Sequence, residues 1–350
     1  MKNKPIVCLL IISSVFTMSV NVIYGEESLI FHDQQTVYLL STSPGGEPIR
    51  KELINDADLF NINRSGYFTM RDGSHGNEVW YKGRIDSSFN VTKQPLPHAG
   101  ILSEDGKRIA WNHSEGLGSN ASKSELTIEE YVGNESKVIR KVSVDGFIPA
   151  FSFSPNSGLL AYFSGPPDAV VIDGFSLMLI DLNNPEKQPL EIAPPSLRTR
   201  PLNPNRSNPL WSPNGELILF EARYKNDESL RGSHYIVSID GRTLEPSPGG
   251  KWDQEGKYIN RLERVGDYGS GEYMVIETDV SSNTEKKYPI TIGSSSVSLT
   301  SLSPSGQKIA YVVNKEIFVY DTTKKTTISY GVSQNSAFIG REFFWIFLQD

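Results

Sequence analysis

The stretch WSPNGELILF, residues Trp211–Phe220, indicates the fold of this chain because related stretches recur along it. A close copy, LSPSGQKIAY, occupies Leu302–Tyr311. Looser copies are LSEDGKRIAW at Leu102–Trp111 and FSPNSGLLAY at Phe153–Tyr162, and the latter reads as having one extra residue before its glycine. A repeat that recurs at this spacing is typical of radial or solenoidal β-architectures.

Each copy combines a tight turn with a strand that we expect to be buried. In the copy at Trp211, Gly215 stands where the turn requires a positive φ, and Pro213 fits the first corner, where φ is already restricted. The run after the glycine is short, apolar and rich in aromatic residues, as in a buried strand. A second apolar run and a more polar one follow. Together with the strand that ends at the turn, each repeat therefore supplies four antiparallel strands, which is one blade of a β-propeller.

The spacing of the turn glycines predicts the number of complete blades. These glycines recur 40 to 57 residues apart, and they are Gly66, Gly106, Gly158, Gly215, Gly256 and Gly306. Four short strands need about 40 residues, so the longer units carry loop insertions. Six complete blades follow from this count.

The two ends of the chain each hold part of a further blade. Residues 334–350 contain two strand-like runs, one of them at 337–339, and residues 36–40 and 49–53 resemble a third and a fourth strand. Pairing of 334–350 with 29–54 completes a seventh blade and removes the open edges of the sheet. We therefore expect an all-β, seven-bladed propeller of four-stranded antiparallel blades, closed by its terminal strands. The alternative is a ring of six blades, with the C-terminal segment outside it.

The repeat period and the Ser-Pro-Asn-Gly and Ile-Ala-Tyr phrases resemble the TolB-type, WD-like propeller repeats of bacterial periplasmic proteins. The resemblance covers about residues 29–350. TolB carries an α/β domain before its propeller, whereas here the first expected strand follows the leader almost directly, so the resemblance extends to the propeller alone. It implies a periplasmic propeller and no particular activity, because propellers support many unrelated functions.

The N-terminus reads as a secretory leader. Two lysines precede an apolar run from Pro5 to about Val20, and small or turn-prone residues lead to Gly25. We predict a signal peptide over residues 1–25 and a mature propeller domain over 26–350, without a membrane span, in the bacterial periplasm or secreted. The alternative is an uncleaved anchor, although three serines, one threonine and one asparagine make the run polar for a bilayer span.

The composition argues against several classes of function. The only cysteine, Cys8, lies in the leader, which excludes a thiolate metal site in the mature chain. Loss of the leader and its two lysines lowers the net charge from −7 to −9, and an acidic protein is a poor partner for nucleic acid. The string Asp72–Gly76 lacks the first glycine of a nucleophile elbow.

The histidines do not suggest a metal site either. No two of them have the spacing of metal ligands, and they are His32, His75, His98, His113 and His234. We therefore expect no metal and no cofactor, and we assign no catalytic residue.

Four long connections carry the candidate binding site, because loops on a rigid scaffold commonly carry function. They are residues 112–124, 164–174, 194–208 and 223–234, and propeller geometry predicts that all four open on one face.

Three arginines in one of these connections, Arg198, Arg200 and Arg206, form a basic patch on an acidic protein. Guanidinium groups bind carboxylates through two parallel hydrogen bonds, so the patch predicts contact with an acidic group. Asp168 and His234, from two other connections, complete the predicted binding site. The alternative is a solvated linker whose arginines pair with nearby acids.

These observations favour a binding module, with another envelope or extracellular protein as the partner of the loop-rich face. The alternative is an enzyme that acts on a carbohydrate or a lactone at the mouth of the central channel. A close cluster of three histidines or carboxylates at the axis would favour the enzyme.

Overall fold

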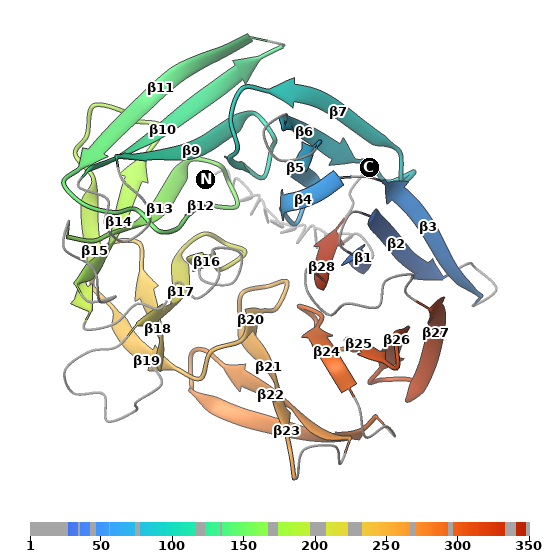
Figure 1. The fold of residues 1–350 in the computed structure, drawn as a ribbon. Coiled ribbons are helices and arrows are strands. Elements are labelled where there is room, and N and C mark those ends of the chain that lie inside the picture. The colour runs from blue at the N-terminus through green and yellow to red at the C-terminus, as the bar shows by residue number, and fades with distance from the viewer. Residues whose placement is uncertain are drawn as a thin grey trace, which may run out of the picture.

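The computed structural model describes residues 27–33, 36–42, 47–55, 57–73, 78–115, 123–133, 135–166, 174–196, 208–222, 233–266, 271–292, 297–332 and 341–347. In these ranges the regular elements are strands, which form seven four-stranded antiparallel sheets arranged as the blades of a ring (Figure 1). The first strand of each blade lies nearest the centre of the ring (Figure 1). Across the same ranges, no helix has the length and apolar character needed to cross a membrane.

The strand bounds of the first four blades follow the repeats in the sequence. Blade I comprises β4 (Ala57–Ile62), β5 (Tyr67–Asp72), β6 (Val79–Ile85) and β7 (Val91–Leu96). Blade II comprises β8 (Ile101–Leu102), β9 (Arg108–Glu115), β10 (Lys123–Val132) and β11 (Glu135–Val144). Blade III comprises β12 (Phe151–Phe153), β13 (Leu159–Ser164), β14 (Phe175–Asp181) and β15 (Leu190–Ser196). Blade IV comprises β16 (Leu210–Trp211), β17 (Leu217–Ala222), β18 (Ser233–Ser238) and β19 (Leu244–Ser247).

The remaining three blades complete the ring. Blade V comprises β20 (Lys251–Trp252), β21 (Tyr258–Arg264), β22 (Glu272–Asp279) and β23 (Thr284–Thr291). Blade VI comprises β24 (Val297–Leu302), β25 (Lys308–Val313), β26 (Glu316–Asp321) and β27 (Thr326–Val332). Blade VII comprises β28 (Arg341–Phe347), β1 (Glu27–Asp33), β2 (Thr36–Thr42) and β3 (Pro48–Ile54).

Blade VII joins the two ends of the chain and confirms the predicted closure of a seven-bladed ring. Strand β28 pairs antiparallel with β1, with Phe31 opposite Phe343 and Leu29 opposite Trp345. The rings of Phe31 and Phe343 lie 5.0 Å apart. Because β28 lies inside this blade, the six-bladed alternative is wrong.

The division of blade VII between the two ends differs from the prediction. The C-terminus contributes one described strand and the N-terminus three, whereas two from each end were expected. Strands β2 and β3 are the third and fourth strands, as predicted, but β1 takes the second position. Its apolar centre is only Leu29-Ile30-Phe31, which is short for a strand signal, yet all three side chains are buried. Residues 337–339 lie outside the described residues.

A buried serine organises the repeated turn. In blade IV the Ser212 Oγ accepts a hydrogen bond from Leu217 N at 2.9 Å and donates one to Asn214 Oδ1 at 2.7 Å. Ser212 is completely buried. Gly215 has φ +74° and Gly306 has φ +72°, which confirms the left-handed conformation expected of the turn glycines.

The turn of blade III corrects one detail of the sequence alignment. Ser157, with φ +59°, takes the left-handed position there in place of Gly158. Ser157 N donates to Ser154 O at 2.9 Å, as Gly215 N donates to Ser212 O at 2.9 Å. The turn therefore has the same length as the others, and the extra residue was wrong. The neighbouring glycine shifted the alignment by one position.

Adjacent blades are tied together near the axis by tryptophan side chains. Trp211 Nε1 donates to Ser152 O at 3.2 Å, and Trp252 Nε1 donates to Leu210 O at 2.9 Å. Each bond runs from the inner strand of one blade to the inner strand of the preceding one. Trp211 and Trp252 thus each contribute buried area and a satisfied polar group at a blade boundary.

Candidate binding site

The two faces of the ring carry different connections. On the turn face, as we name it, the repeated turn joins the first strand to the second, and another turn joins the third to the fourth. On the opposite loop face, the second strand leads to the third and each blade leads to the next. Links and loops contact each other there, since Ser124 Oγ donates to Gly146 O at 2.7 Å and Phe147 N donates to Gly165 O at 3.2 Å.

The strand ends that bound the four predicted connections all belong to the loop face. The four pairs of ends are Glu115 and Lys123, Ser164 and Phe175, Ser196 and Leu210, and Ala222 and Ser233. Of the five predicted site residues, Arg198, Arg200, Arg206 and Asp168 lie outside the described residues. The fifth, His234, is in β18.

His234 is packed against the link that leads to blade V. It stands opposite Glu221 on β17 and is half-buried. Gly249 approaches it so closely that a Cβ there would lie 2.5 Å from His234 Nδ1, and Gly249 also has φ +73°. Burial lowers the pKa of His234, which outweighs the nearby Glu221 carboxylate. The imidazole is therefore a neutral packing group at neutral pH, and any contact with a partner stays a prediction.

Three further histidines belong to the described residues, and they are His32, His98 and His113. His32 is buried in blade VII and accepts a long hydrogen bond of 3.5 Å from Leu59 N. His98 is exposed, and its ring lies 4.2 Å from that of Trp111. Within the described ranges, no group of three histidine, cysteine, aspartate or glutamate side chains is placed to hold a metal ion. His75 is outside those ranges.

A group of three charged residues lies at the inner end of blade I on the loop face. Arg71 Nη2 lies 2.5 Å from Asp58 Oδ2, and Arg71 Nη1 lies 2.9 Å from Glu78 Oε1. The hydrogen bond that Arg71 donates to the Asp58 carboxylate raises the pKa of Arg71. Both carboxylates are engaged by the same guanidinium, so this group is a mutually satisfied ion-pair network.

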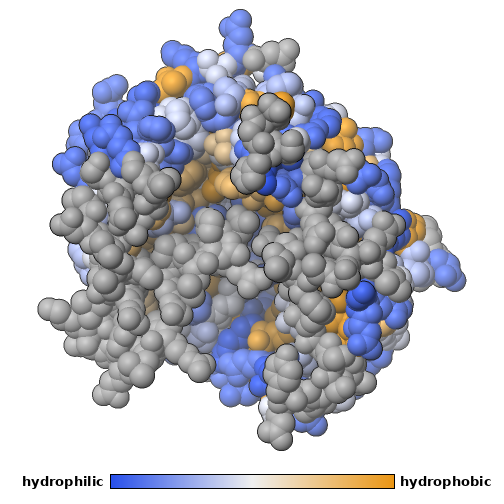
Figure 2. Space-filling view, viewed as in Figure 1, coloured by the Kyte–Doolittle hydropathy of each residue, from blue (hydrophilic) through white to orange (hydrophobic). Residues whose placement is uncertain are grey.

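The inner strands also present a set of partly exposed side chains, which we name the axial belt. Its members stand two positions before the repeated turn in blades I to VI, and they are Asn61, Ile101, Ser152, Leu210, Lys251 and Ser301. All six keep some exposure, whereas the residue after each is buried in five of the six blades. In the surface view, apolar residues are visible toward the middle of the ring and polar residues dominate its rim (Figure 2).

Lys251 is the only charged member of the axial belt, and sequence reasoning did not single it out. Its Nζ donates to Ser301 Oγ of the next blade at 3.0 Å. Desolvation lowers the pKa of Lys251 to about 8. In the blade V copy of the repeat, Asp253 takes the place of the turn serine, and Lys251 stands two residues before it. Aligning the copies by their turns would have shown this lysine at a position where the other five copies have an uncharged residue.

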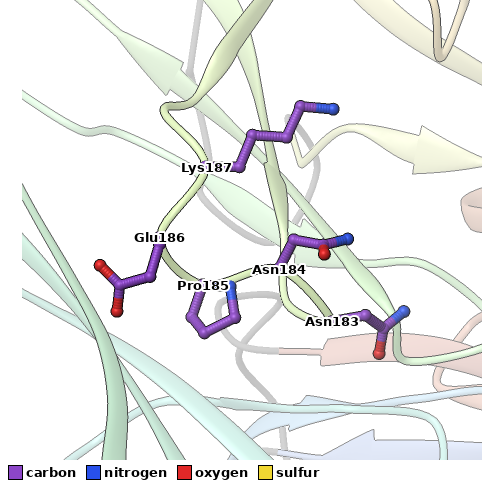
Figure 3. A pocket seen from close by; sticks show the side chains of 5 residues that line it. All are labelled: Asn183, Asn184, Pro185, Glu186 and Lys187. Atoms are coloured by element: carbon purple, nitrogen blue, oxygen red, sulfur yellow. The ribbon is translucent and has the colours of Figure 1, made fainter.

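A shallow depression on the turn face is less suited to binding. One turn lines it, with Asn183, Asn184, Pro185, Glu186 and Lys187 (Figure 3). The Glu186 and Lys187 side chains point in different directions rather than toward a common centre (Figure 3). The backbone of the turn is already held, because Arg140 Nη2 donates to Lys187 O at 3.1 Å. The depression lacks convergent polar groups.

The comparisons with known proteins agree with this architecture. No protein-family model and no curated protein matches the chain. Among solved structures, the oligogalacturonate lyase of Vibrio parahaemolyticus is similar with a TM-score of 0.54 and 10% identity, over 89% of this chain and 88% of that one. A functionally unknown protein of Desulfotomaculum acetoxidans has a TM-score of 0.52 and 10% identity, over 93% and 100% of the two chains.

A third similar structure, from Bacteroides uniformis, is provisionally described as a 6-phosphogluconolactonase. Its TM-score is 0.50 and its identity 12%, over 91% of this chain and 99% of that one. At these identities the likeness concerns the fold and carries no activity. The chain is therefore a seven-bladed β-propeller, related by structure to propellers described as a lyase and as a lactonase.

Proposed function

We propose that this protein is a periplasmic or secreted binding module that recognises another protein through its loop face. The observation that supports this is the unequal length of one connection in different blades. Between the second and third strands, blade VI uses two residues, whereas blades II, III and IV use seven to ten. A hairpin needs about two to five residues, so the additional length serves something other than the blade itself. Loops on a rigid scaffold are suited to binding.

The chemistry of the link between blades III and IV suggests the character of the partner. Arg198, Arg200 and Arg206 all lie between the end of β15 and the start of β16. A cluster of guanidinium groups on a protein of net charge −7 would attract an acidic surface selectively. We propose that these arginines contact carboxylates of the partner, and that Asp168 and His234 belong to the same contact surface.

Two charge-matched variants test this proposal. The loop-face variant carries Arg198→Ala, Arg200→Ala and Arg206→Ala. The turn-face control carries Lys107→Ala, Lys187→Ala and Lys257→Ala, three exposed lysines of turns on the opposite face. Wild type and both variants are used to capture partners from a bacterial envelope extract, and an identified partner is then titrated at low and moderate salt.

The loop-face variant should bind the partner more weakly than wild type and with a flatter salt dependence, whereas the control should match wild type. Both variants should keep the wild-type melting temperature, because surface changes usually cost less than about 0.5 kcal/mol. Equal affinity of the loop-face variant and wild type at both salt concentrations would contradict the proposed site.

The repeat class and the compartment belong to the same proposal. We propose that the repeat is of the TolB type, on the basis of the Ser-Pro-Asn-Gly turn, and that a leader over residues 1–25 directs export. Residues 1–26 lie outside the described residues. Mass spectrometry of protein exported by a bacterial host should find Glu26 or a near neighbour at the N-terminus, whereas Met1 on a membrane-bound product would contradict the leader. An enzyme that acts on a carbohydrate or a lactone stays the alternative prediction.

A further inference from the structure

Lys251 is a cation without a described anion. Among the described residues its Nζ makes one hydrogen bond, to Ser301 Oγ, although an ammonium group has three donors. No carboxylate of the described residues lies within ion-pair distance of its Nζ. Two other lysines of the same blade form ion pairs, since Lys286 Nζ lies 3.5 Å from Glu277 Oε1 and Lys287 Nζ lies 3.2 Å from Glu285 Oε2. Lys257 has no such pair within the described part of the chain but is exposed to water, whereas the Lys251 ammonium is largely desolvated.

The backbone around Lys251 holds it close to the neighbouring strand. Gly250, with φ +132°, comes directly before it, and a Cβ at that position would lie 2.6 Å from Asn260 O. Lys251 itself stands opposite Asn260 in the register of β20 and β21. The side chain then crosses to Ser301 on the inner strand of blade VI. Strand, link and hydrogen bond together fix the ammonium at the boundary of two blades.

The surroundings of this ammonium combine a hydroxyl group with an exposed apolar side chain. Leu210 belongs to the inner strand of blade IV, and its carbonyl oxygen accepts the hydrogen bond from Trp252 Nε1, beside Lys251. The Leu210 side chain is 42% exposed, which is high for a leucine on an innermost strand. The other belt members are uncharged. Blades IV, V and VI therefore bring together an apolar surface, an ammonium and a hydroxyl.

Leaving a largely desolvated charge without a counter-ion lowers the stability of a fold, because burial removes hydration that nothing replaces. A bound anion would supply the missing partner and would bind through a charge-assisted hydrogen bond. Burial also lowers the pKa of this amine to about 8, which agrees with an environment that lacks a fixed negative charge.

We propose that the axial belt at blades IV to VI binds a small organic carboxylate. Lys251 Nζ donates to the carboxylate, Ser301 Oγ provides a second donor, and the exposed Leu210 side chain contacts the hydrocarbon part of the ligand. This site differs from the loop-face surface, and it requires neither a protein partner nor the arginines of the link.

Titration with a small set of probes tests the site in the mature protein. The probes are hexanoate and benzoate, with the neutral benzamide as a control for apolar binding. The variant Lys251→Met removes the charge at similar volume, and Ser301→Ala removes the second donor. Lys257→Met is the matched control, since Lys257 is an exposed lysine of the same blade. Binding is followed by calorimetry and by the shift of melting temperature.

Wild type and Lys257→Met should bind the carboxylates with equal affinity and bind benzamide at least about tenfold more weakly, the loss of one charge-assisted contact. Lys251→Met should lose about tenfold in carboxylate affinity, and its melting temperature should no longer respond to hexanoate. The melting temperature of unliganded Lys251→Met should equal or exceed that of wild type, which shows that the variant folds.

Three results would overturn the proposal. One is equal carboxylate binding by wild type and Lys251→Met. Another is wild-type binding of benzamide as tight as that of benzoate. The third is wild-type binding of a peptide through its C-terminal carboxylate together with no binding of hexanoate or benzoate, which would reject a small-molecule ligand.

Discussion

The boundary between blades III and IV and the boundary between blades I and II are built on different chemistry. Between blades III and IV, the described residues form a cluster of fourteen buried hydrophobic side chains, in which the rings of Phe163 and Phe220 lie 6.1 Å apart. Between blades I and II, the corresponding cluster in the described part of the chain has three, which are Leu96, Leu102 and Ile109. Aromatic and charged residues occupy the rest of that boundary.

Polar contacts dominate the boundary between blades I and II. Lys82 Nζ lies 3.1 Å from the centre of the Tyr131 ring, and burial lowers the pKa of Lys82. Within blade II, Trp111 packs against the boundary cluster, and its Nε1 donates to Glu129 Oε1 at 3.1 Å, where Glu129 is only 6% exposed.

Buried apolar area stabilises by about 25 cal/mol per Å², whereas a buried polar contact must first offset the loss of hydration. Repeats with the same turn therefore produce boundaries of unequal strength, and we expect the boundary between blades I and II to open more readily than the one between blades III and IV.

Deletion of residues 343–350 is the most severe test, because both boundaries should then fail together. The deletion removes most of β28, with three phenylalanines and a tryptophan. Phe343 and Trp345 are buried, and each large aromatic contributes about 1.5–3 kcal/mol on burial, which is a large part of a total domain stability of about 5–15 kcal/mol. The product should be insoluble or unfolded by circular dichroism. Deletion of residues 348–350 alone is the control, and an unchanged melting temperature of the longer deletion would refute the role of β28.

Phe220→Ala should reveal how much the apolar boundary contributes. Phe220 is 4% exposed and contacts the rings of Phe163 and Tyr235. Removing a buried phenylalanine costs about 3–5 kcal/mol, because transfer energy is lost and a cavity remains. Urea unfolding gives the loss directly. Tyr288→Ala, at an aromatic residue of β23 that is 46% exposed, should change the stability by less than about 0.5 kcal/mol. Similar losses in the two variants would mean that the III–IV cluster is not a principal source of stability.

Glu104→Gln should alter the pH dependence of stability at the polar boundary. The Glu104 carboxylate accepts hydrogen bonds from Ser65 Oγ at 3.0 Å and Ser65 N at 3.2 Å, across blades I and II. Desolvation nevertheless raises its pKa, so the folded state holds the proton more tightly than the unfolded chain does. The stability of wild type should therefore fall as pH rises through the interval between the unfolded pKa and the higher folded pKa.

In Glu104→Gln this fall should be smaller. Urea unfolding from about pH 4 to about pH 7 measures it, since that range spans ordinary and raised glutamate pKa values. Glu216→Gln, at an exposed acid of the blade IV turn, is the control and should leave the profile unchanged. A Glu104→Gln profile parallel to that of wild type would contradict the inference.

Tyr131→Phe should have the smallest effect on stability, and it tests the boundary between blades I and II by removing a single hydroxyl group. The Tyr131 hydroxyl is buried without a hydrogen-bond partner, and burial raises the pKa of Tyr131 to about 12. Removing such a group is neutral or stabilises by up to about 1 kcal/mol, because its desolvation is no longer uncompensated. Tyr273→Phe is the matched variant, since the Tyr273 hydroxyl accepts a hydrogen bond from Arg264 Nη2 at 3.3 Å. A larger loss of melting temperature in Tyr131→Phe than in Tyr273→Phe would show that the hydroxyl is engaged.

The fold was predictable because its signals are local and repeated. The Ser212 turn needs a short polar residue, a corner proline and a left-handed position, and each requirement leaves a mark in the sequence. The left-handed position is harder to recognise in the sequence when a residue other than glycine takes it, as Ser157 does in blade III. The second position of strand β1 was missed because its apolar centre is short and because β28, the inner strand that it pairs with, lies at the other end of the chain.

The candidate site was less predictable because its contacts join neighbouring blades or segments that are separated in the sequence. The contact of His234 with Gly249 depends on how β18 and β19 lead into the following link, which residue types alone do not reveal. The hydrogen bond from Lys251 to Ser301 crosses a blade boundary. Only an alignment of the repeated turns shows that the two residues occupy equivalent positions in neighbouring blades. Loop arginines are visible in a sequence, whereas desolvation of one inner-strand lysine is a property of the assembled ring.

Because Glu27 and Phe347 are register partners, the blade that seals the ring combines the earliest and the latest residues of the fold to be synthesised. Until residues 341–347 exist, β1 has an unpaired edge, and an exposed edge is a template for pairing with another chain. Contacts at such sequence separation also form late, since their loop must close before they contribute. The hydrogen bonds that complete one finished molecule are thus the ones that would join two unfinished molecules together.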